Sequence, residues 1–141
     1  METHPAIGER ILSKVEDYDE IASIVRHHHE RVDANGYPDG LEGDAIPPLS
    51  RVIAVADAYN AMTSDRPYRE AMPSRVARLR LAQAVETQFD TSVVAAFEAI
   101  LAGAPEEYRV AKSADFALEM RAHEQEHELP VVAASALALA Q

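Results

Sequence analysis

The sequence contains no cysteine, so neither a disulfide framework nor a thiolate metal site can form. It also has no apolar run of about 18 residues and no apolar segment at its N-terminus, so we expect neither a membrane span nor a signal peptide. These absences fit a cytoplasmic protein. The formal net charge of −11 leaves no excess of positive charge, which argues against DNA or RNA binding because such binding requires a basic surface.

The rest of the composition is that of one folded domain. The chain has 141 residues, of which 48% are hydrophobic, and this is enough to form a core. Apolar residues recur at helical spacing and no segment alternates convincingly as a strand would, which predicts an all-α fold of about five helices. The expected helices run from about residue 5 to 15, 19 to 31, 49 to 64, 74 to 86 and 91 to 102.

Glycine and proline mark the segments that are not helical. Between residues 33 and 48 they are too frequent for regular structure, and a loop of this length in a compact domain is usually functional. Gly103 and Pro105 separate residues 1–103 from a helical acidic tail, residues 104–141. In that tail His123 and His127 have the spacing of a zinc-protease helix, but no third ligand follows them, so we favour a solvated charged helix.

Three adjacent histidines lie near the end of the second expected helix. In helical projection His28 points into the apolar stripe, His29 lies at its flank and His27 points away from it. Two imidazoles near a core are costly unless both are satisfied, and a metal ion would satisfy both by taking a nitrogen lone pair from each. The alternative is a pair of hydrogen-bonded histidines without a metal.

Two further residues extend this candidate site. Asp57 in the third expected helix could bring a carboxylate to His28 and His29, and His4 stands just before the first helix. Three histidines and an aspartate without cysteine suit iron, manganese or zinc in a hydrolytic site. The alternative is that these are unrelated polar residues.

Four ordered blocks cover residues 4 to about 101, and they read HPAIGERIL, HHERVDANGYPDGL, IPPLSRVIAVADAYNAMTSDRPYR and QFDTSVVAAF. Together they resemble the HD-GYP domain of bacterial signalling proteins. The resemblance implies a helical HD-domain bundle that hydrolyses cyclic di-GMP at a metal cluster, with iron or manganese expected. It also implies that His4, His28, His29 and Asp57 are similar to metal ligands of that family.

The same resemblance assigns residues to the nucleotide. The GYP motif consists of Gly36, Tyr37 and Pro38. Its loop approaches the ligand in the family, so Tyr37 is expected to lie against the nucleotide. Arg66 and Arg69 match positions that hold ligand phosphates, which suits the planar fork of a guanidinium. A surface ion pair with a neighbouring carboxylate is the alternative for either arginine.

The sequence departs from the family pattern around the metal site. No His-Asp dipeptide occurs in it, and the helices that would carry this pair would lie before His4. We therefore expect a truncated domain with half of the metal site missing, a metal held weakly or not at all, and no activity by this chain alone. Ala34 and Glu86 stand where glycines are usual, and Asn60 stands where an aspartate is usual.

Two routes would restore activity, namely docking with a separate chain that carries the HD half, or a true start further upstream. The alternative function is a non-catalytic module that binds a nucleotide or a signalling partner such as a diguanylate cyclase domain. Without preceding helices the fold is expected to expose Ile7, Ile11 and Ile24, and such a patch predicts a homo-oligomer or association with another protein.

Overall fold

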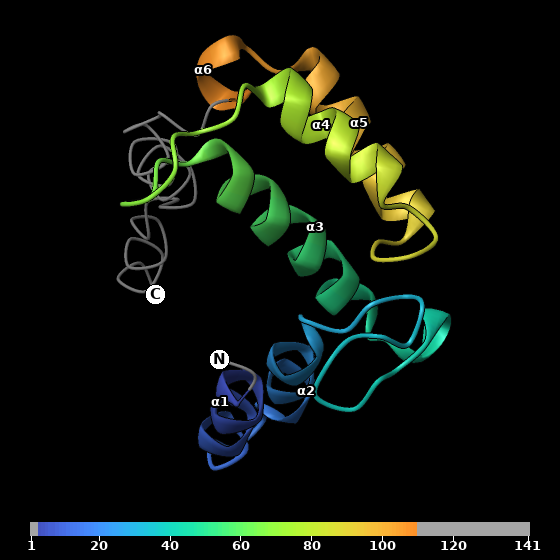
Figure 1. Ribbon diagram of the computed structural model, residues 1–141. Helices are drawn as coiled ribbons and strands as arrows, with labels where there is room; N and C mark the ends of the chain where they lie inside the picture. Colours follow the sequence, from blue (N-terminus) through green and yellow to red (C-terminus); the bar gives the residue numbers. More distant parts are fainter. Residues whose placement is uncertain (1–2, 110–141) are drawn as a thin grey trace, which may run out of the picture. The chain divides into compact units, whose positions relative to one another are not determined.

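The computed structural model describes residues 3–109 (Figure 1), which belong to one compact unit of the chain. Its helices are α1 (His4–Leu12), α2 (Asp19–His27), α3 (Pro48–Thr63), α4 (Ser74–Gln83), α5 (Thr91–Gly103) and α6 (Glu106–Arg109), with a 3-10 turn at Gly43–Ala45. No strand occurs within residues 3–109, which confirms the all-α prediction. Most of the expected acidic tail, with His123 and His127, lies outside the described residues.

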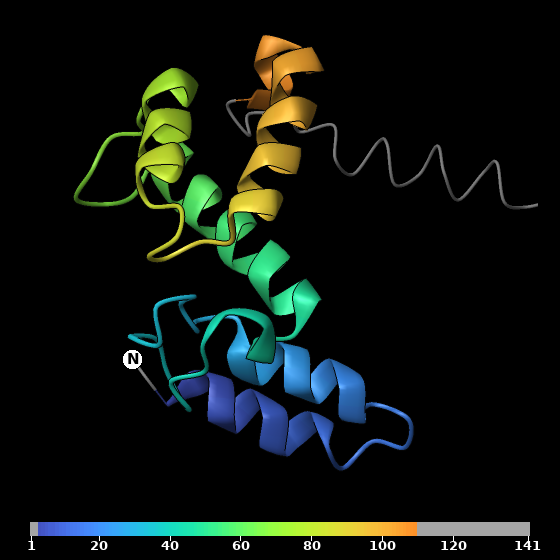
Figure 2. The ribbon, with the colours of Figure 1, turned by 90° about the vertical axis from the view of Figure 1, so that its right-hand side faces the viewer.

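The main hydrophobic core lies between α3, α4 and α5. Val55 and Tyr59 of α3 pack with Leu81 of α4, with Leu101 of α5 and with Phe89 from the turn between α4 and α5. Figures 1 and 2 show α4 and α5 along the half of α3 that is far from α1 and α2. This core fixes α3, the helix that carries Asp57.

Helices α1 and α2 form a second, antiparallel pair, which Figure 2 shows side by side. Gly8 lies where the pair is closest, since a Cβ added to it would be 2.8 Å from Cγ1 of Val25. The glycine therefore allows α1 to approach α2 closely. At the start of α3, Ser50 Oγ donates a hydrogen bond to the carbonyl oxygen of Ile24 (2.9 Å), which ties α2 to α3. The start of α1 is thereby held near the end of α2.

The apolar faces of α1 and α2 are only partly covered. Ile7 and Ile11 are exposed at 44% and 62%, and Ile21 at 45%, as expected for an unpartnered face. The prediction for Ile24 was wrong, because it lies beside the start of α3 and is half-buried. No helix within residues 3–109 is both long enough and apolar enough to cross a membrane.

The second helix ends earlier than predicted. We expected it to reach Arg31, but α2 ends at His27 and His28 is its C-cap. The chain turns there, with the amide of Glu30 bonded to the carbonyl of His27 (3.1 Å). Beyond this turn the Glu30 carboxylate accepts hydrogen bonds from three backbone amides of the following loop. His4 was also misplaced by the prediction, because it is the first residue of α1 rather than a residue before it.

The fourth helix was likewise predicted too long. It ends at Gln83 rather than at Glu86, because the amides of Gln88 and Phe89 both bond to the carbonyl of Ala84 (2.9 and 3.1 Å) and close a turn. Glu86 has a φ of 63° inside this turn. The turn leads directly into α5, whose N-cap is Asp90 as predicted: its carboxylate accepts from the amides of residues 92 and 93.

Candidate metal centre

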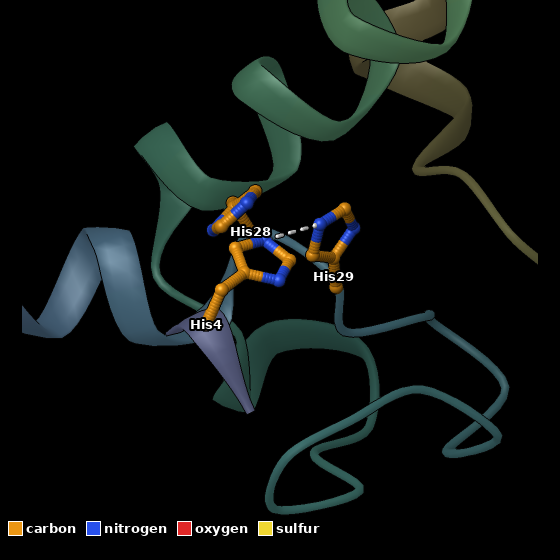
Figure 3. Close-up of side chains that lie close together, drawn as sticks. All are labelled: His4, His28 and His29. Carbon is orange, nitrogen blue, oxygen red and sulfur yellow. Dashed lines mark hydrogen bonds between the residues drawn. The ribbon is translucent and has the colours of Figure 1, made fainter. Parts of the chain in front are cut away.

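Three of the four candidate ligands meet where the start of α1 faces the end of α2. The nitrogen atoms of His4, His28 and His29 that could bind a metal all lie within 4.8 Å of one another. Figure 3 shows the three rings turned toward a common point, with Nε2 of His29 3.1 Å from Nε2 of His4. The rings of His28 and His29 are 4.1 Å apart between centroids. Residues 24 positions apart in the sequence are therefore joined into one imidazole cluster.

One distance in this cluster suits a divalent metal. Two nitrogens bound to one ion at about 2.0–2.1 Å would be about 2.8–3.0 Å apart at octahedral angles and about 3.3–3.4 Å apart at tetrahedral angles. The 3.1 Å between His4 and His29 lies between these values. Nδ1 of His28 donates to the carbonyl of Val25 (2.6 Å), which leaves its Nε2 with a free lone pair. An imidazole oriented by a backbone carbonyl in this way is typical of metal-binding histidines.

The surroundings of His29 favour its neutral form. Burial lowers the pKa of His29, and the neighbouring imidazoles of His28 and His4 lower it further, while Asp57 acts in the opposite direction. Only the neutral ring can donate a lone pair to a metal. The other face of the His29 ring stacks on Tyr37, with centroids 5.0 Å apart and planes inclined by 26°. The tyrosine of the GYP motif thus lies directly against the cluster.

Asp57, the fourth candidate, faces the same pocket from α3. The pocket has a volume of about 310 Å³ and is lined by His28, His29, Tyr37 and Asp57, among others. The carboxylate is exposed and is not part of the close group of nitrogens. Asp57 therefore lines the same pocket as the histidines and is near enough to act on the pKa of His29, but the structure does not bring it into their close group.

The GYP loop folds back onto the end of the histidine segment, and Gly36 is the residue that permits this. A Cβ on Gly36 would lie 2.5 Å from Cα and 2.6 Å from the carbonyl carbon of Glu30, and closer still to the amide nitrogen of Arg31. No side chain fits there. Next to it, the amide of Tyr37 donates to the carbonyl of His29 (3.2 Å), which holds the tyrosine ring in place.

Glu30 is a structural residue of the site that the sequence reasoning missed. Glu30 is only 4% exposed, and its carboxylate accepts three hydrogen bonds from backbone amides. Donors are the amides of Asp39 (2.7 Å), Gly40 (3.1 Å) and Leu41 (3.1 Å). The sequence did contain a signal for this role. Glu30 is a carboxylate just before a glycine-rich loop, and the backbone amides of such a loop need hydrogen-bond acceptors.

A second set of contacts fastens the loop to α2. Arg26 makes a two-pronged contact with Asp39 (2.6 and 2.7 Å) and also reaches Glu9 of α1 (2.9 Å). The Arg26 guanidinium lowers the pKa of Asp39 to about 2. His27 binds the same carboxylate through Nε2 (2.9 Å), so this histidine stays outside the imidazole cluster, in keeping with its predicted direction.

The structure does not bring the two candidate phosphate-binding arginines to the histidines. Arg66 and Arg69 lie in the exposed loop after α3, where their backbones pair with each other (2.9 and 3.0 Å). They line a hollow formed by residues 65–70, and none of these residues lines the histidine pocket. The Arg69 guanidinium donates to the carbonyl of Ala61. Within residues 3–109 neither arginine forms an ion pair, so the alternative interpretation as ion-paired residues is not supported.

The structure also shows the conformation or contacts of the three residues that depart from the family pattern, Ala34, Asn60 and Glu86. Ala34 and Glu86, which stand at usual glycine positions, have φ values of 62° and 63°. This left-handed region is the one that glycine adopts without strain. Asn60 lies on the exposed side of α3, where its Oδ1 accepts from Ser64 Oγ (3.0 Å).

The described part of the chain is an all-α domain with an imidazole cluster that could hold a metal ion. A family model described as an HD domain matches residues 1–93. The chain belongs to this family, and its GYP loop makes it an HD domain of the HD-GYP type.

Several bacterial phosphodiesterases are similar in sequence. The 3'3'-cGAMP-specific phosphodiesterase 3 of Vibrio cholerae is 36% identical over 108 residues, covering 77% of this chain and 24% of that protein. The cyclic di-GMP phosphodiesterase response regulator RpfG of Xanthomonas campestris is 47% identical over 73 residues, covering 50% and 19%. A cyclic di-GMP phosphodiesterase of Thermotoga maritima is 36% identical over 117 residues, covering 82% and 32%. The chain thus spans a third or less of the length of these relatives.

A solved structure shares the fold. The crystal structure of a cyclic GMP-AMP specific phosphodiesterase of V. cholerae superposes with a TM-score of 0.70 at 18% sequence identity. The match covers 85% of this chain and 27% of that one.

Proposed function

We propose that this chain carries the histidine side of a metal-dependent phosphodiesterase site for cyclic di-GMP or a related cyclic dinucleotide. The observation that carries the proposal is the convergence of His4, His28 and His29 within 4.8 Å at the wall of a pocket. Relatives named as cyclic di-GMP or 3'3'-cGAMP phosphodiesterases support the choice of substrate class.

The metal would be held by His4, His28 and His29, with Asp57 of the same pocket as the fourth ligand. Imidazole and carboxylate donors without thiolate suit iron or manganese. A bound divalent ion would polarise a phosphoryl oxygen and activate water for hydrolysis. The chain's own residues orient the reaction: Val25 fixes the tautomer of His28, and the Tyr37 ring covers His29 beside the pocket.

Tyr37, Arg66 and Arg69 would contact the nucleotide. Tyr37 supports this by its position on the pocket wall, where an aromatic ring can lie against a base or ribose. The guanidinium of Arg66 is exposed and forms no ion pair among the residues described, so it is available to a phosphate.

These four ligands would hold one ion. No His-Asp dipeptide occurs in the 141 residues, so we propose that the ligands for a second ion come from outside them. The chain alone would then bind metal weakly and hydrolyse little. A titration calorimetry experiment with Mn²⁺ tests the first part, and chromatography of cyclic di-GMP incubated with chain and Mn²⁺ tests the second.

The adjacent histidines provide a matched set of variants. His28→Ala and His29→Ala should each lower the Mn²⁺ affinity at least about ten-fold, because each removes a ligand. His27→Ala should leave it unchanged, since this ring binds Asp39 instead. Equal Mn²⁺ affinity in all three variants would refute the metal site. Rapid hydrolysis by the chain alone would refute the dependence on further ligands.

A second function, a non-catalytic interaction module, is favoured by the exposed apolar faces of α1 and α2. Ile7, Ile11 and Ile21 are each at least 44% exposed. Exposed large apolar side chains on two packed helices favour an association site, because such a site buries them on binding. We expect a homodimer in light scattering that Ile11→Glu converts to a monomer. A monomer in the unmodified chain would argue against this function, as would hydrolysis without a partner.

A further inference from the structure

A second hollow adjoins the histidine pocket beside α3. It has a volume of about 240 Å³ and shares Ala58, Gln88 and Phe89 with the histidine pocket. A ligand whose phosphate lies at the imidazoles therefore has this second hollow next to it. The shared residues come from α3 and from the turn between α4 and α5, so two different elements form the boundary between the two hollows.

The walls of the second hollow are mainly apolar. Met62, Leu81, Ala84 and Phe89 line it, and Arg80 is its one charged residue. A narrow space between a methionine, an aromatic ring and small side chains suits a flat aromatic group, because thioether and ring faces both pack well on π-systems. Ligand sites commonly combine such walls with a small number of polar groups that fix the orientation.

Gln88 is the neutral polar residue at the junction of the two hollows. Its side-chain amide forms no hydrogen bond within residues 3–109 and is not a buried unpaired group, so it is open to a ligand in either hollow. Its backbone is well fixed, because the amide nitrogen bonds to Ala84 (2.9 Å). The carbonyl of the preceding residue, Thr87, also accepts from the amide of Asp33 (3.1 Å). A donor and an acceptor are thus presented on a rigid turn, without a partner in the described part of the chain.

We propose that Gln88 is a specificity-determining residue that hydrogen-bonds a purine base of the cyclic dinucleotide, with the base lying in the second hollow. The inference rests on the proposed function, which places the dinucleotide phosphate at the histidines. An amide pairs its donor and acceptor with N7 and the N6 amino group of adenine. It pairs equally with O6 and N1–H of guanine, so the wild-type residue accepts either purine.

Changing the hydrogen-bonding character of Gln88 tests this directly. Gln88→Leu keeps the approximate size and removes both polar groups, so the affinities for cyclic di-GMP and cyclic di-AMP should each fall about ten-fold or more. Gln88→Glu offers acceptors only. It retains pairing with N1–H and N2–H of guanine and loses adenine, so the ratio of the two affinities should shift about ten-fold toward cyclic di-GMP. Both affinities would be measured by calorimetry on the full chain with Mn²⁺ present.

Gln83→Leu is the matched control, because Gln83 is exposed near the same turn and lines neither hollow. It should change neither affinity. The Mn²⁺ affinity and melting temperature of each variant are measured in parallel to show that it is folded and holds the metal. If Gln88→Leu does not fold, the ratio of affinities in Gln88→Glu tests the proposal. Wild-type affinities and an unchanged ratio in folded Gln88 variants would overturn this inference while leaving the proposed function intact. A wild-type chain that binds Mn²⁺ but no cyclic dinucleotide would overturn both.

Discussion

Residues 28–41 and residues 64–73 are the two loop-forming segments whose motifs point to a ligand, and the structure holds their side chains differently. In the first, the Glu30 carboxylate accepts from backbone amides of the loop, and Arg26 of α2 pairs with Asp39. The second has hydrogen bonds of its own, between the backbones of Arg66 and Arg69 and from the amide of Ala71 to Asp65. Its side chains are less enclosed, since Tyr68 is 100% exposed and Arg66 forms no ion pair among residues 3–109. The contrast between the two loops therefore lies in how firmly their ligand-facing side chains are held.

The difference follows from what each segment must do. Metal ligands have to be held within a fraction of an ångström, so the segment that carries His28 and His29 is supported by several independent contacts. A phosphate contact made by a long arginine tolerates movement, because the guanidinium can follow the ligand. We therefore expect substitutions in the first segment to affect both folding and metal binding, and substitutions in the second to affect ligand affinity alone.

Gly36→Ala should have the largest effect. The new Cβ would overlap the backbone of Glu30 and Arg31, which cannot move without disturbing the histidines. We expect a loss of about 3 kcal/mol or more in the free energy of unfolding, and at least about a ten-fold loss of Mn²⁺ affinity. Chemical denaturation and calorimetry would measure the two effects.

Gly103→Ala is the control for that substitution. An added Cβ at Gly103 meets no atom within 4 Å, and this glycine ends α5 without a positive φ. The expected change is within about 0.5 kcal/mol. If Gly36→Ala were as well tolerated as Gly103→Ala, the GYP loop would not be packed against the histidine segment as described.

Glu30→Gln should have the next largest effect. The amide side chain keeps the shape but loses one acceptor and the negative charge, so at least one of the three backbone amides faces an NH₂ group instead. Hydrogen bonds to a charged acceptor contribute about 1.5–3 kcal/mol each, and we expect a destabilisation of about 2–3 kcal/mol by chemical denaturation. Glu42→Gln, at an exposed position of the same loop, should change stability by less than about 0.5 kcal/mol. A comparable small change in Glu30→Gln would show that the loop is held by other contacts.

Ala34→Gly and Glu86→Gly should stabilise the protein. Both residues adopt φ values near 60°, where a side chain costs about 1 kcal/mol or more. The greater freedom of glycine in the unfolded chain offsets part of this gain, so we expect about 0.5–1 kcal/mol for each substitution. Ala96→Gly, at an exposed position in the middle of α5, should instead destabilise by about 1 kcal/mol. Destabilisation by both loop substitutions would contradict the left-handed conformations at these positions.

Local signals in the sequence were sufficient for much of the fold. Helical periodicity and the positions of proline and glycine located α3 and α5 to within one residue at each end. They failed at the C-terminal ends of α1, α2 and α4, where backbone amides and carbonyls are used by turns instead of by the helix; α1 ends at Leu12 rather than near Val15, whose amide bonds to the carbonyl of Leu12. The turns after α2 and α4 are stabilised by partners that are distant in sequence, such as the amide of Asp33 on the carbonyl of Thr87, and periodicity contains no information about them.

The candidate site could be predicted where residue type alone sets the chemistry. His4, His28 and His29 were chosen because imidazoles are metal ligands, and the structure brings them together. Glu30 and Gln88 were not chosen, because a carboxylate and an amide have many uses and their role depends on which atoms face them. Only the folded loop shows that three amides donate to Glu30. Only the three-dimensional structure shows that Gln88 lines two adjoining hollows.

Arg66→Ala should have the smallest effect on stability and thereby complete the contrast between the two loops. Its side chain is exposed and forms no ion pair within the described residues, so the free energy of unfolding should stay within about 0.5 kcal/mol of the unmodified chain. The Mn²⁺ affinity should also be unchanged, whereas the affinity for cyclic di-GMP should fall several-fold because a charged contact to phosphate is lost. Arg75→Ala, on the exposed face of α4, is the control and should change none of the three quantities. A residue that contacts only the nucleotide phosphate does not affect Mn²⁺ binding when no nucleotide is present. A loss of Mn²⁺ affinity in Arg66→Ala would therefore mean that the exposed loop and the histidine segment form one site.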